Sequence, residues 1–169
     1  MSDQKPKLDH LLWAVGGLLT GAWWVKNQND EAKKSRAEKD DGEDVAAVCE
    51  AIGPILDDWG PEDYDTEFGF VEDLRDYLIT QTDGEFGIEM FPSTREGKPD
   101  ILIDDILALE VKVALSKIER DRLIGQTAAY SREWVTWIVL IDTSESRVGS
   151  LQKLLADKGL DHILVFAFS

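Results

Sequence analysis

The sequence of 169 residues has very few of the side chains that build disulfides or transition-metal sites, with one cysteine and two histidines. A single cysteine, Cys49, cannot form an intrachain disulfide, and it excludes a metal site built from several cysteines. Cys49 falls in an apolar helical pattern, where we expect it to pack as a small hydrophobic side chain. We assign no role to His10 or His162. The length predicts about one domain with a short additional segment.

Basic residues are also scarce, because 18 Lys and Arg stand against 34 Asp and Glu, a net charge of -16 at pH 7. This excess is unusual for a chain whose apolar share of 43% is that of an ordinary globular protein. Two interpretations compete: an acidic protein that avoids nucleic acid, or a halophilic protein adapted to molar salt, in which a Debye length of ~3 Å screens surface charge. Because the acidic residues are spread along the sequence rather than gathered in blocks, we favour the halophilic interpretation.

No apolar run clearly reaches the length of a bilayer span. Residues 1–25 form a hydrophobic N-terminal segment, and its uncharged part, LLWAVGGLLTGAWWV, would cover about 22 Å as a helix against a bilayer core of ~30 Å. Extending it to residues 8–25 lengthens it, and Trp23 and Trp24 suit a membrane interface. We expect a membrane anchor, while a cleaved signal and an amphipathic helix that docks on a partner are the alternatives.

The charges around this segment predict its orientation. Fewer lysines precede it than follow it, and the positive-inside bias places the long C-terminal part in the cytoplasm, anchored to the inner face of the membrane. Residues 26–44, KNQNDEAKKSRAEKDDGED, are almost wholly polar and predict a linker. Apolar periodicity begins at Val45, so that residues 45–169 predict a folded domain.

The domain alternates helical and extended patterns, which predicts the α/β class. A short helix from Val45 is interrupted by Gly53 and Pro54, and a second helix is capped by Asp65 or Thr66. Three extended stretches predict an antiparallel meander with a hairpin turn at Asp104 and Asp105, and a helix, a strand, a helix and a strand follow. These later elements are expected at residues 87–92, 99–104, 106–115, 116–134, 137–142, 147–158 and 162–169.

The stretch PDILIDDILALEVK, residues 99–112, carries three charged side chains in an otherwise apolar pattern. Glu110 and Lys112 are two apart in a strand and share a face, and the hairpin turn brings Asp100 roughly opposite Glu110. Two carboxylates provide oxygen ligands for Mg²⁺, or for Mn²⁺ as a substitute, and a neighbouring lysine can hold the attacking water and neutralise charge on a phosphate. This arrangement predicts hydrolysis of a phosphodiester.

The order Pro99-Asp100, nine intervening residues and Glu110-Val111-Lys112 resembles the PD-(D/E)xK nuclease superfamily, in its Holliday-junction-resolvase-like or Mrr-like branch. The resemblance implies a restriction-endonuclease-like fold, a three-layer α/β/α core around a mixed sheet. It also implies that Asp100 and Glu110 hold Mg²⁺ together with the Val111 carbonyl, and that Lys112 positions the nucleophile.

Further positions extend the resemblance, which covers about residues 66–142. Glu67 begins the second helix, where members of the superfamily often place an acid, and it would assist the metal or the water. Gln126 and Tyr130 lie four apart on the helix after the lysine strand, as in some branches, and Gln126 would contact water or phosphate.

Structural roles compete with these assignments. Asp100 can be a turn residue after proline, Glu110 and Lys112 a half-buried ion pair, and Glu67 a charge that compensates the helix N-terminus. The glutamine and tyrosine of the following helix can be packing residues.

Basic side chains gather beside the motif although the chain is acidic, and they predict a nucleic-acid-binding rim. The solvated face of a helix is the alternative. The contacts that we expect are Lys98, Lys117, Arg120, Arg122 and Tyr130.

These patterns predict a metal-dependent nuclease, a DNA endonuclease tethered at its N-terminus. The alternative is a non-catalytic, membrane-tethered interaction module that retains a nuclease-like fold, since a fold does not determine a function. A homodimer would suit the cleavage of two strands, but no feature of the sequence predicts one.

Overall fold

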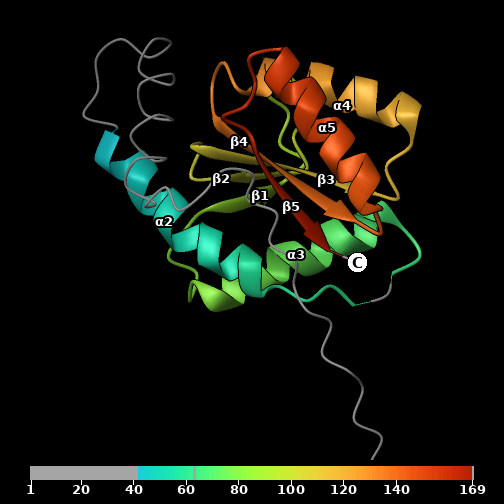
Figure 1. Cartoon of the computed structure of the whole chain (residues 1–169). Coiled ribbons are helices and arrows are strands. Elements are labelled where there is room, and N and C mark those ends of the chain that lie inside the picture. Colours follow the sequence, from blue (N-terminus) through green and yellow to red (C-terminus); the bar gives the residue numbers. More distant parts are fainter. Residues whose placement is uncertain (1–41, 63, 169) are drawn as a thin grey trace, which may run out of the picture.

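A computed structural model describes residues 42–62 and 64–168 of the chain (Figure 1). The predicted anchor at residues 8–25 and most of the predicted linker lie outside the described residues. None of the helices in the described ranges has both the length and the apolar character needed to cross a membrane. The elements are α2 (Gly42–Asp58), α3 (Glu67–Gln81), β1 (Ile88–Met90), β2 (Ile101–Ile103), β3 (Leu107–Val113), α4 (Lys117–Tyr130), β4 (Val135–Ile141), α5 (Glu145–Asp157) and β5 (Leu164–Phe168).

The strands form one open, mixed sheet in the order β1-β2-β3-β4-β5. The first three strands pair antiparallel as a meander, and β3, β4 and β5 run parallel, joined by the crossover helices α4 and α5. The α/β class, the mixed sheet and the meander that the sequence predicts are therefore confirmed.

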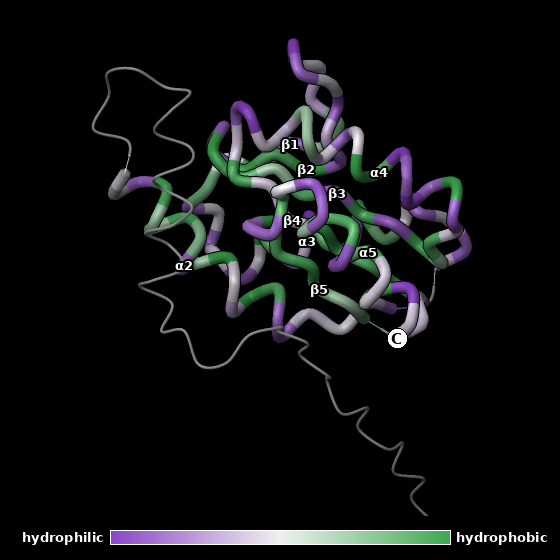
Figure 2. Tube along the Cα trace, turned by 45° about the horizontal axis from the view of Figure 1, so that its top comes forward, coloured by the Kyte–Doolittle hydropathy of each residue, from purple (hydrophilic) through white to green (hydrophobic). Residues whose placement is uncertain are grey.

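Helices cover both faces of the sheet. On one face, α2 and α3 bury their apolar stripes against alternate residues of the strands, among them Leu107, Leu109 and Val111 of β3. On the other face, α4 and α5 pack on Ile138 and Leu140 of β4. Figure 2 shows the strands as the hydrophobic part of the trace, between helices that mix hydrophobic and hydrophilic residues. Because side chains alternate along a strand, the intervening residues of β3 face the α4 side of the sheet.

Helix α2 continues through Gly53 and Pro54, so the interruption expected there is wrong. A proline inside a helix removes one hydrogen bond, here the one to the carbonyl of Glu50. Both Pro54 and Glu50 are exposed, so water can hydrate that carbonyl. Ile52 and Leu56 on the opposite side are fully buried, and their packing holds the helix together across the proline.

The ends of α3 and α4 show how local hydrogen bonds delimit the helices next to the site. The Thr66 hydroxyl accepts a hydrogen bond of 3.2 Å from the Gly69 amide and caps α3. Ser116 and Glu119 form a complete capping box at the start of α4. The predicted continuation of α4 to Trp134 is wrong, because the chain turns after Tyr130 and the Trp134 indole donates to Asp105 Oδ1 at 2.9 Å.

Candidate active site

The hairpin between β2 and β3 brings Asp100 beside Glu110, as the sequence predicts. Asp104 and Asp105 have φ angles of 50° and 55°, and Ile103 accepts a hydrogen bond from the Ile106 amide at 2.9 Å. Two successive residues with positive φ are the signature of the tight turns that join antiparallel strands. The register pairs Ile101 with Leu109, so the next pair outward joins residues 100 and 110.

Lys112 lies at the centre of a cluster of three carboxylates. Its Nζ is 2.9 Å from Glu67 Oε1, 3.2 Å from Glu110 Oε1 and 3.4 Å from Asp100 Oδ2. It also donates a hydrogen bond to the carbonyl of Val111. The Lys112 ammonium thus brings together four of the five residues predicted as catalytic and the predicted carbonyl ligand. Glu67 takes part although it comes from a helix on the other face of the sheet.

Asp100 is held by the backbone on both sides. Its Oδ2 accepts a hydrogen bond of 2.7 Å from the Val111 amide, and its own carbonyl accepts one of 2.9 Å from the amide of Phe91. Burial raises the pKa of the Asp100 carboxyl, while Lys112 and the Val111 amide act to lower it, and the balance leaves the pKa raised.

Glu110 is the most buried carboxylate of the cluster, with its side chain only 2% exposed. One oxygen pairs with Lys112, but Oε2 has no hydrogen-bond partner within the described parts of the chain. Burial, and then the charge of Asp100, raise the pKa of Glu110 to about 7. A buried carboxylate oxygen without a partner is costly, and in native structures it calls for an explanation such as an ion.

The charge of Lys112 is stabilised by its surroundings. Burial acts to lower the pKa of the ammonium, but Asp100, Glu110 and Glu67 together outweigh this effect and raise it above its ordinary value. Lys112 is therefore a permanent cation at neutral pH, and it partly compensates three neighbouring acids.

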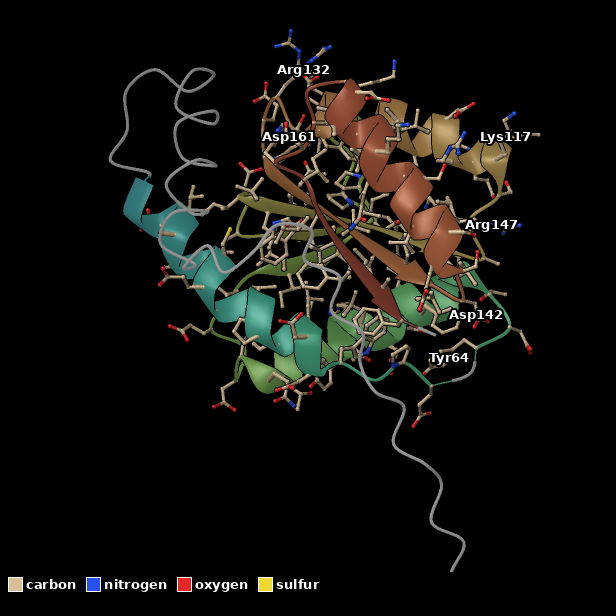
Figure 3. All side chains as sticks on the ribbon, in the orientation of Figure 1. Tyr64, Lys117, Arg132, Asp142, Arg147 and Asp161 are labelled. Carbon is tan, nitrogen blue, oxygen red and sulfur yellow. The ribbon has the colours of Figure 1, made fainter. Side chains whose placement is uncertain are left out.

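A cleft of about 700 Å³ opens over this cluster, within the size range of small-molecule and cofactor sites. All five residues predicted as catalytic line it, and so do three of the predicted nucleic-acid contacts, Lys98, Arg122 and Tyr130. The other two contacts lie elsewhere. Lys117 projects outward at the start of α4 (Figure 3), and Arg120 turns toward α5, where it donates to Ser150 Oγ at 2.9 Å.

Gln126 and Tyr130 form the α4 wall of the cleft. Burial, and then the charge of Glu110, raise the pKa of the Tyr130 phenol, and hydrogen bonds from the Lys98 backbone and the Gln126 side chain act in the opposite direction. Gln126 thus uses its amide donor on Tyr130, whereas its Oε1 is buried without a partner among the described residues.

The sequence did not identify some of the residues that line the cleft. Neither Gly97 nor Glu119, which completes the capping box at the start of α4, was predicted at the site. Phe91 has φ 50°, which is a rare backbone conformation for a residue with a bulky side chain. No feature of the sequence predicts this conformation. The lining residues outside the prediction are Phe91, Glu96, Gly97, Glu119, Gly125 and Ala129.

The oxygen donors of the cluster are of the chemical kind that a hard divalent cation prefers. Mg²⁺ binds through one or two carboxylates and carbonyl or water oxygens, and the unpartnered Glu110 Oε2 beside Asp100 offers such ligands. The three carboxylates surround the Lys112 ammonium. Within residues 42–62 and 64–168, no three acidic, histidine or cysteine side chains are arranged so that they could hold a metal ion together.

Comparisons with known proteins give no match to this chain. No protein-family model matches the chain, and the searches for similar curated proteins and similar solved structures returned no match.

Proposed function

We propose that the domain is a Mg²⁺-dependent phosphodiesterase of the PD-(D/E)xK type, with a restriction-endonuclease-like core, that cleaves DNA as an endonuclease. One observation carries the proposal: the buried Glu110, with an unpartnered oxygen and a pKa raised to about 7, lies beside Asp100 and Lys112 on the wall of a cleft. Crowded acids with perturbed pKa values in a cleft are typical of functional sites.

The proposed roles combine the positions of the side chains with the resemblance to the nuclease superfamily. Asp100 and Glu110 would hold the cation together with the Val111 carbonyl, and Mg²⁺ would supply polarisation of the scissile phosphate. Lys112 would orient the attacking water and neutralise the charge that develops on the phosphate oxygens. Glu67, at 2.9 Å from the ammonium, would position Lys112 and assist the metal or the water.

The α4 wall would contact the substrate. The unpartnered Oε1 of Gln126 would accept a hydrogen bond from the water. Lys98 and Arg122, which line the cleft, would meet phosphates, with Tyr130 beside them. Lys117 would reach a nucleic acid that extends beyond the cleft. Arg120, which bonds to Ser150, would serve mainly to join α4 to α5.

The predicted anchor and a possible pairing of two copies complete the proposal. We propose from the sequence that residues 8–25 attach this domain to the inner face of the cell membrane, which the positive charges after the segment support. A homodimer would bring two clefts to the two strands of a duplex.

The test is cleavage of plasmid and branched DNA by the full-length protein, at low and molar KCl, with Mg²⁺, Mn²⁺ or EDTA. We expect cleavage that requires the metal and falls roughly 100-fold or more in Lys112→Ala, because a cation that stabilises the transition state is lost. Glu110→Gln preserves shape and should abolish the rise in melting temperature that Mg²⁺ produces in the wild type. Lys153→Ala, an exposed lysine of α5, is the matched control.

A clear outcome would contradict the proposal. If the folded wild type cleaves neither DNA at either salt concentration, and Mg²⁺ does not shift its melting temperature, the domain is not a metal-dependent DNA endonuclease. The non-catalytic interaction module would then be the function to pursue.

A further inference from the structure

Two phenylalanine rings and a lysine lie together beside the cleft, and we call them the aromatic platform (Phe68, Phe91 and Lys98). The rings of Phe68 and Phe91 stack with centroids 5.7 Å apart and an angle of 14° between their planes. The Lys98 Nζ lies 5.3 Å from the centroid of the Phe91 ring, within the range of a cation–π contact. Phe68 is 53% exposed although a phenylalanine is usually buried.

The platform joins segments that are far apart in the sequence. Phe68 lies in the first turn of α3, and Phe91 directly follows β1 in a left-handed backbone conformation, φ 50°. Non-glycine residues in this conformation are uncommon and concentrate at functional sites. Hydrophobic burial alone does not account for an aromatic stack in which one phenylalanine is more than half exposed.

Each ring is tied to a residue of the candidate active site. Phe68 directly follows Glu67, whose carboxylate pairs with Lys112 at 2.9 Å. The Phe91 amide donates to the carbonyl of Asp100 at 2.9 Å. Phe91 and Lys98 also line the cleft itself. A flat group stacked on the platform would therefore lie beside the cleft that contains the carboxylate cluster.

We propose that the aromatic platform binds an unpaired nucleobase of the DNA strand that is cut, so that the substrate is single-stranded DNA or a strand that leaves a duplex. This inference rests on the proposed nuclease function and gives its substrate class. A base offers a flat π-surface to the exposed Phe68 ring, and Lys98 supplies positive charge for the neighbouring phosphate. In a continuous duplex, the faces of the bases are covered by their neighbours and cannot stack on a protein ring.

The acidity of the chain favours this mode of binding. With a net charge of -16, the protein offers few cations for a long phosphate backbone. Stacking on aromatic rings supplies affinity that does not depend on the release of counterions, so this part of the binding is less sensitive to salt than contacts with phosphates.

The test uses the full-length protein and a short single-stranded DNA with 2-aminopurine at its centre, in EDTA and in Ca²⁺. Stacking on Phe68 should quench the emission of 2-aminopurine, and Phe68→Ala should abolish the quenching and weaken binding roughly 10-fold. Phe68→Tyr should restore both. Ile118→Ala, which removes another exposed apolar side chain outside the cleft lining, is the matched control and should behave as the wild type.

The same variants are then compared in Mg²⁺ on the single strand and on its blunt duplex. Absence of binding by the wild type, or equal binding and quenching by wild type and Phe68→Ala, would overturn the inference. Metal-dependent cleavage that Phe68→Ala leaves unchanged would also overturn it, while the proposed function would stand. Quenching that depends on Phe68 without any cleavage would support the platform and reject the nuclease.

Discussion

Glu110 shows the cost that one residue imposes on the fold. Its pKa lies at about 7 instead of the ordinary 4.5, first through burial and then through the charge of Asp100, and Lys112 only partly compensates. Between pH 4.5 and about pH 7, Glu110 keeps its proton in the folded protein but has released it in the unfolded chain. Stability therefore falls as the pH rises through this window, by up to about 3 kcal/mol from this group alone.

The direction of this pH dependence gives a prediction for Glu110→Gln, whose side chain does not titrate. In EDTA, the free energy of unfolding of the wild type should fall relative to that of Glu110→Gln between pH 5 and pH 8, by roughly 3 kcal/mol. Urea denaturation at intervals across this range measures the difference. Glu72→Gln removes an exposed acid and should give a curve parallel to the wild type. A Glu110→Gln curve parallel to the wild type would show that Glu110 titrates normally.

At the scale of elements, the segment between β1 and β2 is held against the last turn of α4. Gly97 has φ 139°, and a Cβ at this position would lie 2.8 Å from Cε1 of Tyr130. The Gly97 carbonyl accepts hydrogen bonds from both the amide and the hydroxyl of Thr94. Glycine is required here both by the conformation and by the close approach. This contact positions Lys98 and the start of β2 beside α4.

We predict that Gly97→Ala destabilises the protein by roughly 2 kcal/mol, because the new methyl group strains the backbone and displaces the Tyr130 ring. Gly149→Ala is the matched control. Gly149 lies in α5 with open space around its Cβ position, so alanine there should stabilise the helix by about 0.5–1 kcal/mol. Urea denaturation measures both changes. Equal effects of the two substitutions would contradict the packing argument.

At the scale of the whole molecule, the excess of 34 acids over 18 bases makes the folded chain repel itself. The Debye length shortens from about 10 Å at 0.1 M salt to ~3 Å at 1 M, so added salt removes most of this repulsion. Compact states with a large net charge gain stability from such screening.

We therefore predict that the melting temperature rises by several degrees from low to molar KCl. A triple variant, Glu72→Gln, Glu85→Gln and Asp161→Asn, neutralises three exposed acids. It should be more stable than the wild type at low salt and gain less from KCl, because fewer charges remain to be screened. Differential scanning calorimetry measures both. Equal gains in the two proteins would mean that KCl acts through apolar burial rather than through charge.

The meeting of Asp100, Glu110 and Lys112 could be predicted because it depends on local rules. Alternation along β3 and the tight turn at residues 104–106 determine which side chains share a face and which lie opposite. The contact between Glu67 and Lys112 was harder to predict, since it requires α3 to lie against the edge of the cluster. The stack of Phe68 on Phe91 could not be predicted, because it depends on a left-handed residue that the sequence does not mark.

The amino-acid pattern alone established the α/β class, the meander and the central charged residues, because periodicity and turn chemistry act over a few neighbouring residues. Tertiary packing decided the rest. It kept α2 helical across Pro54, ended α4 at Tyr130 through the bond from Trp134 to Asp105, and turned Arg120 away from the cleft toward Ser150. Each of these outcomes depends on contacts between distant segments, which outweigh local preferences once the core is formed.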